Sequence, residues 1–93
     1  MAAICSHLDT IRHVEGREGV TGCPACLAIG STWVHLRRCT ECGQVGCCDD
    51  SPNRHASAHH AESGHPVIRS IEPAENWLFC YEDQVAFTLG GVD

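Results

Sequence analysis

Cysteine and histidine are the residues of this chain whose type and spacing could bind a metal ion. They account for eight and seven of its 93 residues. Those at ligand spacing are Cys5, His7, Cys23, Cys26, Cys39, Cys42, Cys47, His55, His59, His65 and Cys80. Two Cys-x-x-Cys pairs followed by histidines four residues apart bring thiolate and imidazole together at the short separations that tetrahedral zinc demands. The sequence therefore predicts a zinc-binding framework, and we expect folding to depend on the metal.

Disulfide formation is the competing use of so many cysteines. It would be favoured in a secreted protein, but the first residues, MAAIC, have no basic start and no apolar stretch of seven or more residues. We therefore expect a reducing cytoplasm, where disulfides are rare. No segment approaches the roughly 20 consecutive apolar residues that span a membrane, so we expect no membrane partner.

The charge of the chain argues against nucleic acid as a partner. Twelve acidic residues stand against six basic ones, which gives a net charge of -6. Binding to phosphates requires the opposite balance. Filling three sites with zinc would not reverse this, because seven thiolates would meet six positive charges and leave the net charge about one unit more negative.

The distribution of ligand-type residues predicts one domain over residues 1–93, with a core from about 5 to 87. No repeat, low-complexity tract or linker interrupts it. A chain of this length builds only a small hydrophobic core, so bound metal would be an important stabiliser. We expect a monomer.

The clearest helix is predicted for residues 51–63. Ser51 can cap its first turn, Pro52 suits its first position, and a Gly-His-Pro sequence follows its end. His55 and His59 would then lie one turn apart on the same face.

Short β-branched or aromatic stretches predict the strands of a small sheet. They cover residues 33–37, 67–71, 77–81 and 85–88. The Gly- and charge-rich stretch 12–22 predicts a loop, and 89–93 a loose tail. The expected fold is α+β, with a twisted, mostly antiparallel sheet, one main helix and interleaved zinc sites.

The order ICSHL, CPAC, WVHLRRCTEC, VGC and HASAHHAESGHP resembles the ubiquitin-protease-type zinc finger, a module of deubiquitinases and of a cytoplasmic histone deacetylase. The resemblance runs from Cys5 to about Phe87. The stretches GCCDDSPNRHA and GHPVIRSIEP resemble a small standalone bacterial branch of the family.

The resemblance implies interleaved metal sites. The first would use Cys23, Cys26, Cys47 and His55, the second Cys39, Cys42, His59 and His65, and the third Cys5, His7, Cys80 and Asp83. Asp83 stands where three-metal members have the last cysteine of a late Cys-x-x-Cys, and a carboxylate oxygen is an acceptable zinc ligand. Because protein atoms would fill all four positions of each site, the zinc would be structural and the protein no enzyme.

Family members often capture the free C-terminal Gly-Gly of ubiquitin in a pocket that has an arginine and aromatic rings. Trp33 and Tyr81 match two walls of that pocket, and Phe79 replaces a tryptophan. The position of the arginine is Asp49, followed by Asp50, and two carboxylates would repel an incoming carboxylate. A surface of Trp33, Phe79, Tyr81 and Asp49 suits a basic or amine-bearing partner instead. The alternative is that the aromatics belong to the core and the carboxylates are solvated.

Two functions remain open. The first is a zinc-binding protein-interaction module whose partner is a protein or peptide. The second is a zinc- or redox-responsive thiol protein, which oxidation would strip of metal. Two other motifs are weaker: His13-Val-Glu15 with the first cysteine pair only faintly resembles a zinc deaminase, and Cys-Pro-Ala-Cys lacks the preceding strand of a redox pair. The role of Cys48 stays unassigned.

Overall fold

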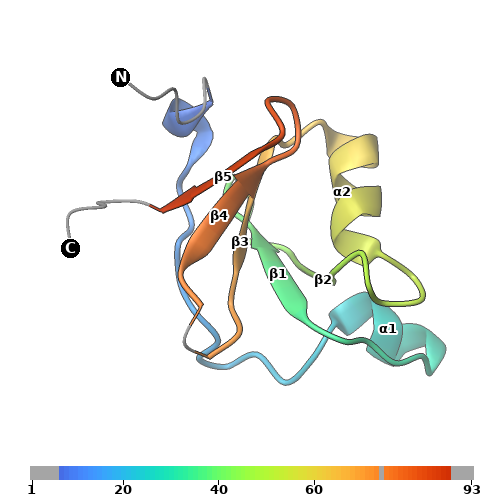
Figure 1. The fold of residues 1–93 in the computed structure, drawn as a ribbon. Coiled ribbons are helices and arrows are strands. Elements are labelled where there is room, and N and C mark those ends of the chain that lie inside the picture. The colour runs from blue at the N-terminus through green and yellow to red at the C-terminus, as the bar shows by residue number, and fades with distance from the viewer. Residues whose placement is uncertain (1–6, 74, 89–93) are drawn as a thin grey trace.

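The computed structural model describes residues 7–73 and 75–88 (Figure 1). Its elements in chain order are the 3-10 helix η1 (Leu8–Thr10), α1 (Pro24–Ile29), β1 (Leu36–Cys39), β2 (Val45–Cys47), α2 (His55–Ser63), β3 (Val67–Ser70), β4 (Trp77–Cys80) and β5 (Val85–Thr88). The predicted tail at 89–93 lies outside the described residues. No helix of the described residues is long and apolar enough to cross a membrane.

The strands form one sheet with the order β2-β1-β3-β4-β5, and every neighbouring pair is antiparallel. Arg37 of β1 pairs with Ser70 of β3, and Ile68 of β3 pairs with Phe79 of β4. Directly paired residues point to the same face of a sheet, as do residues two apart on one strand. Arg37, Ile68, Trp77 and Phe79 therefore share one face. The predicted α+β fold with a mostly antiparallel sheet is confirmed.

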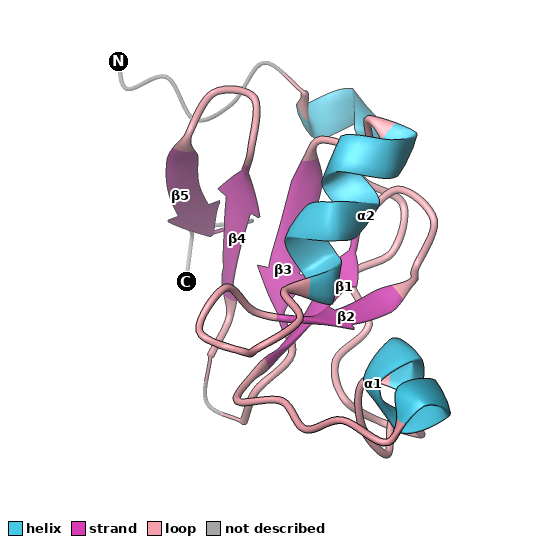
Figure 2. Cartoon of the chain, turned by 90° about the vertical axis from the view of Figure 1, so that its right-hand side faces the viewer, coloured by secondary structure: helices cyan, strands magenta, loops and turns pink. Residues whose placement is uncertain are grey.

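Helix α2 covers the β2 end of this face (Figure 2). The two backbones meet at Gly46, where an added Cβ would lie 2.8 Å from the backbone nitrogen of Ala56. A side chain at position 46 would clash with the first turn of the helix, so glycine is needed there for close approach.

Helix α2 begins at His55 rather than at Ser51. Ser51 is buried, and its Oγ accepts a hydrogen bond of 2.8 Å from the backbone N–H of Val34, so it ties a loop instead of capping the helix. Arg54 precedes the helix with φ 47, and the N–H of His55 donates to the Cys47 Sγ at 3.2 Å. The sulfur therefore takes the place of a side-chain cap.

Three elements were not predicted, namely η1, α1 and β2. Cys23 caps α1 by accepting from the N–H of Cys26, Pro24 occupies its first turn, and Gly30 ends it with φ 70. These are ordinary helix signals, but six residues are too few to show a hydrophobic period. The three-residue strand β2 is likewise too short, while the predicted strand 33–37 is shifted to Leu36–Cys39.

The opposite face of the sheet carries the core. One cluster gathers Leu36, Val45 and Ile71 with Cys23, Cys26 and Cys47, and the other gathers Val67, Leu78 and Cys80. The segment 11–23 forms no helix or strand, as predicted for 12–22. It is held to the sheet because Arg38 donates to the carbonyls of Glu15 and Gly16, at 3.1 and 3.0 Å.

Candidate metal centre

Three groups of side chains place potential metal-binding atoms within 4.8 Å of one another. The core cluster is Cys23, Cys26, Cys47 and His55, the helix cluster is Cys39, Cys42, His59 and His65, and the outer cluster is His7, Cys80 and Asp83. The structure thus gathers the residue sets predicted from the sequence, while Cys5 lies outside the described residues. The two helical histidines belong to different clusters.

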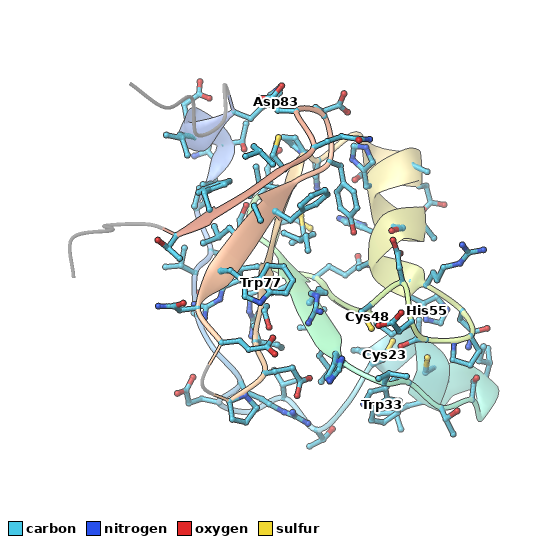
Figure 3. All side chains as sticks on the ribbon, viewed as in Figure 1. Cys23, Trp33, Cys48, His55, Trp77 and Asp83 are labelled. Atoms are coloured by element: carbon cyan, nitrogen blue, oxygen red, sulfur yellow. The ribbon has the colours of Figure 1, made fainter. Side chains whose placement is uncertain are left out.

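The core cluster joins α1, β2 and α2. The Nδ1 atom of His55 lies 3.3 Å from the Sγ atoms of Cys23 and Cys26 and 3.5 Å from that of Cys47. The Cys26 and Cys47 sulfurs are 3.8 Å apart. The three cysteines are fully buried, and Figure 3 shows Cys23 and His55 near each other where the two helices approach. This cluster fastens both helices to the edge of the sheet.

The helix cluster joins β1 and the turn after it to α2 and to the Gly-His-Pro segment that follows this helix. The Cys39 Sγ lies 3.4 Å from the Nδ1 of His65, and the Cys42 Sγ lies 3.3 Å from the Nε2 of His59. These two ring nitrogens are 3.3 Å apart. The Nε2 of His65 lies 3.8 Å from a Glu41 carboxylate oxygen. Such a contact would help to orient the ring as a ligand.

The outer cluster brings the first described residue beside the β4–β5 turn. The Nδ1 atom of His7 lies 3.4 Å from the Cys80 Sγ and 3.6 Å from a carboxylate oxygen of Asp83. The N–H of Asp83 donates to the same sulfur at 3.4 Å. Figure 3 labels Asp83 in this turn, close to the N-terminal segment.

The donor separations can be compared with those around a zinc ion. With bonds of about 2.3 Å to sulfur and about 2.0 Å to nitrogen, a tetrahedron places two sulfurs about 3.8 Å apart, sulfur and nitrogen about 3.5 Å apart, and two nitrogens about 3.3 Å apart. The observed separations are 3.8 Å between the sulfurs of Cys26 and Cys47, 3.3 to 3.5 Å between sulfur and nitrogen, and 3.3 Å between the ring nitrogens of His59 and His65. The donors therefore fit tetrahedral zinc.

Electrostatics ties the thiolate form of these cysteines to a bound cation. Burial, together with the neighbouring thiols of Cys23 and Cys47, raises the pKa of Cys26 to about 11. Burial also raises the pKa of Cys39; hydrogen bonds from the backbone of Cys42 and Glu41 oppose this rise, and the Cys42 thiol adds to it. Several adjacent thiolates are unfavourable at neutral pH unless a cation stabilises them, and a coordinated thiol is deprotonated outright.

A groove of about 230 Å³ lies on the part of the sheet face that α2 leaves open. It is lined by Arg37, Cys48, Asp49, Asp50, Ile68, Trp77, Phe79 and Tyr81. Three of the four predicted partner-binding residues, Asp49, Phe79 and Tyr81, therefore lie together. Trp33 does not join them. Its ring lies so close to Gly22 that a Cβ added there would be 2.4 Å from it, and it packs beside the core cluster near α1 (Figure 3).

Sequence reasoning missed Arg37 and Trp77 as groove residues. The guanidinium carbon of Arg37 lies 4.6 Å from the Trp77 ring centroid. Both residues fall in predicted strands, and the alternation of Trp77 with Phe79 along one strand was a usable signal. Their meeting on one face depends on β1, β3 and β4 being neighbours, which strand positions alone do not specify.

Comparisons with known proteins agree with this geometry. Residues 23–88 match the family described as the Zn-finger in ubiquitin-hydrolases and other proteins. The solution NMR structure of a protein from the bacterium Rhodopseudomonas palustris is 49% identical, with a TM-score of 0.81, over 98% of this chain and 87% of that one. No curated protein matches the chain. The resemblance inferred from the cysteine and histidine pattern is confirmed, and the chain belongs to the zinc-finger family of the ubiquitin hydrolases.

Proposed function

We propose that the protein is a non-catalytic protein-interaction module folded around three structural zinc ions. The observation that carries the proposal is the agreement of donor separations with the edges of a zinc tetrahedron. The core and helix clusters would each supply four protein ligands. The outer cluster would be completed by Cys5, which stands two residues before His7 in the sequence.

The donor count favours a structural role. A catalytic zinc site keeps one position open for water or substrate, whereas a site with four protein ligands is closed. The four donors of the core cluster already lie within 4.8 Å of one another. Zinc would therefore supply folding free energy and no Lewis-acid step.

The zinc ligands flank the residues that line the groove, which favours an interaction role. Cys47 immediately precedes the stretch Cys48 to Asp50, and Cys80 stands between Phe79 and Tyr81. Holding these ligands in place would also hold the groove in shape before a partner arrives. A preformed surface binds at a lower cost in ordering entropy.

Capture of a ubiquitin-like C-terminal carboxylate is not part of the proposal. Asp49 and Asp50 line the groove, and both are exposed. A carboxylate bound beside them would meet two like charges, which costs affinity and selects against such a ligand.

Native mass spectrometry of the protein isolated gently from its own cells tests the zinc count. We expect three zinc ions and, after chelation, loss of the folded circular dichroism spectrum. A chain that keeps its fold without zinc would refute the structural role. A bound partner that is released when zinc is removed would support the interaction role.

Mild peroxide separates this function from a thiol-based sensor. The three thiolates of the core cluster are fully buried, so this cluster should keep its zinc, because oxidation needs access to the sulfur. The matched variant Cys48→Ser removes a cysteine outside the three clusters. Zinc release at low peroxide from both proteins would favour the redox-responsive alternative.

A further inference from the structure

The groove on the open part of the sheet face is the strongest feature that the zinc clusters do not explain. Its volume of about 230 Å³ is below the roughly 300–1,000 Å³ of sites for drug-sized ligands. This volume is also too small to enclose a helix of about 10–12 Å diameter. Its size suits one long side chain.

One wall of the groove is negatively charged. Asp49 and Asp50 are both exposed, and no Lys, Arg or His of the described residues forms an ion pair with either. Asp49 is held in place because Ser57 Oγ donates to its carboxylate at 2.5 Å. This hydrogen bond orients the carboxylate but leaves its charge uncompensated.

Arg37 is the only basic residue among those lining the groove, and its charge is already compensated. Its guanidinium stacks on the ring of Trp77, donates to the Leu36 carbonyl at 3.0 Å and to Ser70 Oγ at 3.3 Å, and lies 4.0 Å from a Glu75 carboxylate oxygen. Only 12% of its side chain is exposed. The charge offered to a ligand is therefore that of the two aspartates.

The other walls are aromatic and apolar. Phe79 and Tyr81 meet edge to face with centroids 5.5 Å apart, and His60 stacks on Tyr81 at 4.5 Å. The Tyr81 hydroxyl also lies 3.3 Å from Ser57 Oγ, so the ring is fixed from two sides. Rings beside carboxylates attract cations, and the apolar side chain of Ile68 suits the methylene stem of a basic side chain.

We propose that this groove binds a lysine or arginine side chain presented by a partner protein, with Asp49 and Asp50 pairing its charge and Phe79 and Tyr81 contacting its stem. This inference rests on the proposed interaction function and names the chemistry of the partner. The net charge of -6 would also speed the approach of a basic surface.

The test uses the zinc-loaded protein and three peptides in NMR titrations at low ionic strength. One is a capped Gly-Gly-Arg-Gly-Gly, the second replaces arginine by its neutral isostere citrulline, and the third is an uncapped peptide ending in Gly-Gly. The two tryptophans provide an internal control, because Trp77 lines the groove and Trp33 does not. We expect the arginine peptide to shift the Trp77 indole signal alone and to bind roughly 10- to 100-fold more tightly than the citrulline peptide.

A pair of variants locates the charge. Asp49→Asn with Asp50→Asn should weaken binding of the arginine peptide by about three- to tenfold. The control, Asp9→Asn with Glu18→Gln, removes two exposed carboxylates elsewhere and should leave binding nearly unchanged. Equal affinity for arginine and citrulline, tighter binding of the uncapped peptide, or equal loss in both variants would overturn the inference.

The outcomes separate the two proposals. A protein that holds three zinc ions and a partner, but does not distinguish arginine from citrulline, would keep the proposed function and lose this one. A protein without the expected zinc would fail the proposed function itself.

Discussion

The core cluster and the outer cluster use similar donors in different surroundings. In the core cluster the three cysteines are fully buried, and they make up half of the six buried residues of the hydrophobic core around Leu36. In the outer cluster the side chains of His7 and Asp83 are 32% and 37% exposed. The metal of the core cluster would replace a missing hydrophobic interior, whereas that of the outer cluster would fasten the N-terminal segment to a surface turn.

This difference shows that ligand type alone does not determine how much each site contributes to stability. We expect that contribution to follow the number of elements that each cluster joins. The core cluster connects three elements, namely α1, β2 and α2. The outer cluster adds a contact to β4, which already pairs with β3 and β5. The predictions below test this ranking.

The largest effect is expected for Cys47→Ser. It removes one of three thiolates from the core cluster and the sulfur that accepts the N–H of His55. We expect loss of one zinc ion and destabilisation by at least about 3 kcal/mol, enough to unfold a domain of marginal stability. Native mass spectrometry and chemical denaturation measure both. Cys48→Ser, the neighbouring substitution outside the clusters, should keep the full zinc count, and equal damage from both variants would contradict the ranking.

A smaller effect is expected for Gly46→Ala, which alters no ligand. Its Cβ would lie 2.8 Å from the Ala56 nitrogen, so α2 must move away from β2 and separate His55 from Cys47. We expect a loss of about 1–3 kcal/mol in unfolding free energy and weaker zinc retention against a chelator. Gly16→Ala is the matched control, because its Cβ would meet only the flexible Glu18 carboxylate at 3.4 Å. If both variants hold zinc equally well, the packing of α2 on β2 does not support the core cluster.

Asp83→Ala should cost less and act only on the outer cluster. We expect one zinc ion fewer, an unchanged fold of the sheet and a loss of about 1 kcal/mol. Asp83→Cys should restore the count, because thiolate is also a zinc ligand. An unchanged zinc count in Asp83→Ala would remove this residue from the ligand set.

The metal framework was predictable because its signals are local in the sequence. Cys-x-x-Cys pairs and histidines four residues apart indicate metal binding without knowledge of the fold. Strands β3, β4 and β5 were also predicted, since each is a compact β-branched or aromatic stretch. The start of α2 was not, because Ser51 and Pro52 form a helix signal that the hydrogen bond between Val34 and Ser51 overrides.

The groove was only partly predictable, because local sequence patterns do not report contacts between distant segments. Asp49, Phe79 and Tyr81 were identified because they occupy positions of the family's binding pocket in the resemblance. Arg37 and Trp77 come together only through the strand order, and Trp33 is kept away by its packing against Gly22. Such placements depend on contacts between segments distant in sequence, which no local pattern reports.

The smallest predicted effect is the influence of the Asp49 charge on the pKa of Tyr81. Burial raises the pKa of Tyr81; the hydrogen bond from Ser57 opposes this rise and the charge of Asp49 adds to it. Asp49 lies two residues after Cys47 of the core cluster, and Tyr81 follows Cys80 of the outer cluster. Coupling between Asp49 and Tyr81 therefore reports that the two regions face each other across the groove.

Tyr81 is the only tyrosine, so the ultraviolet absorbance of phenolate follows it alone. A raised pKa means that the fold favours the neutral phenol, and this stabilisation is present below the ordinary value of 10.0 and is lost as the pH rises above it. Asp49→Asn should lower the pKa of Tyr81 while leaving it above the ordinary value, because burial remains. Asp50→Asn, which removes the neighbouring charge, should change it less. Equal titration curves for the wild type and Asp49→Asn would mean that the two walls of the groove do not approach each other in solution.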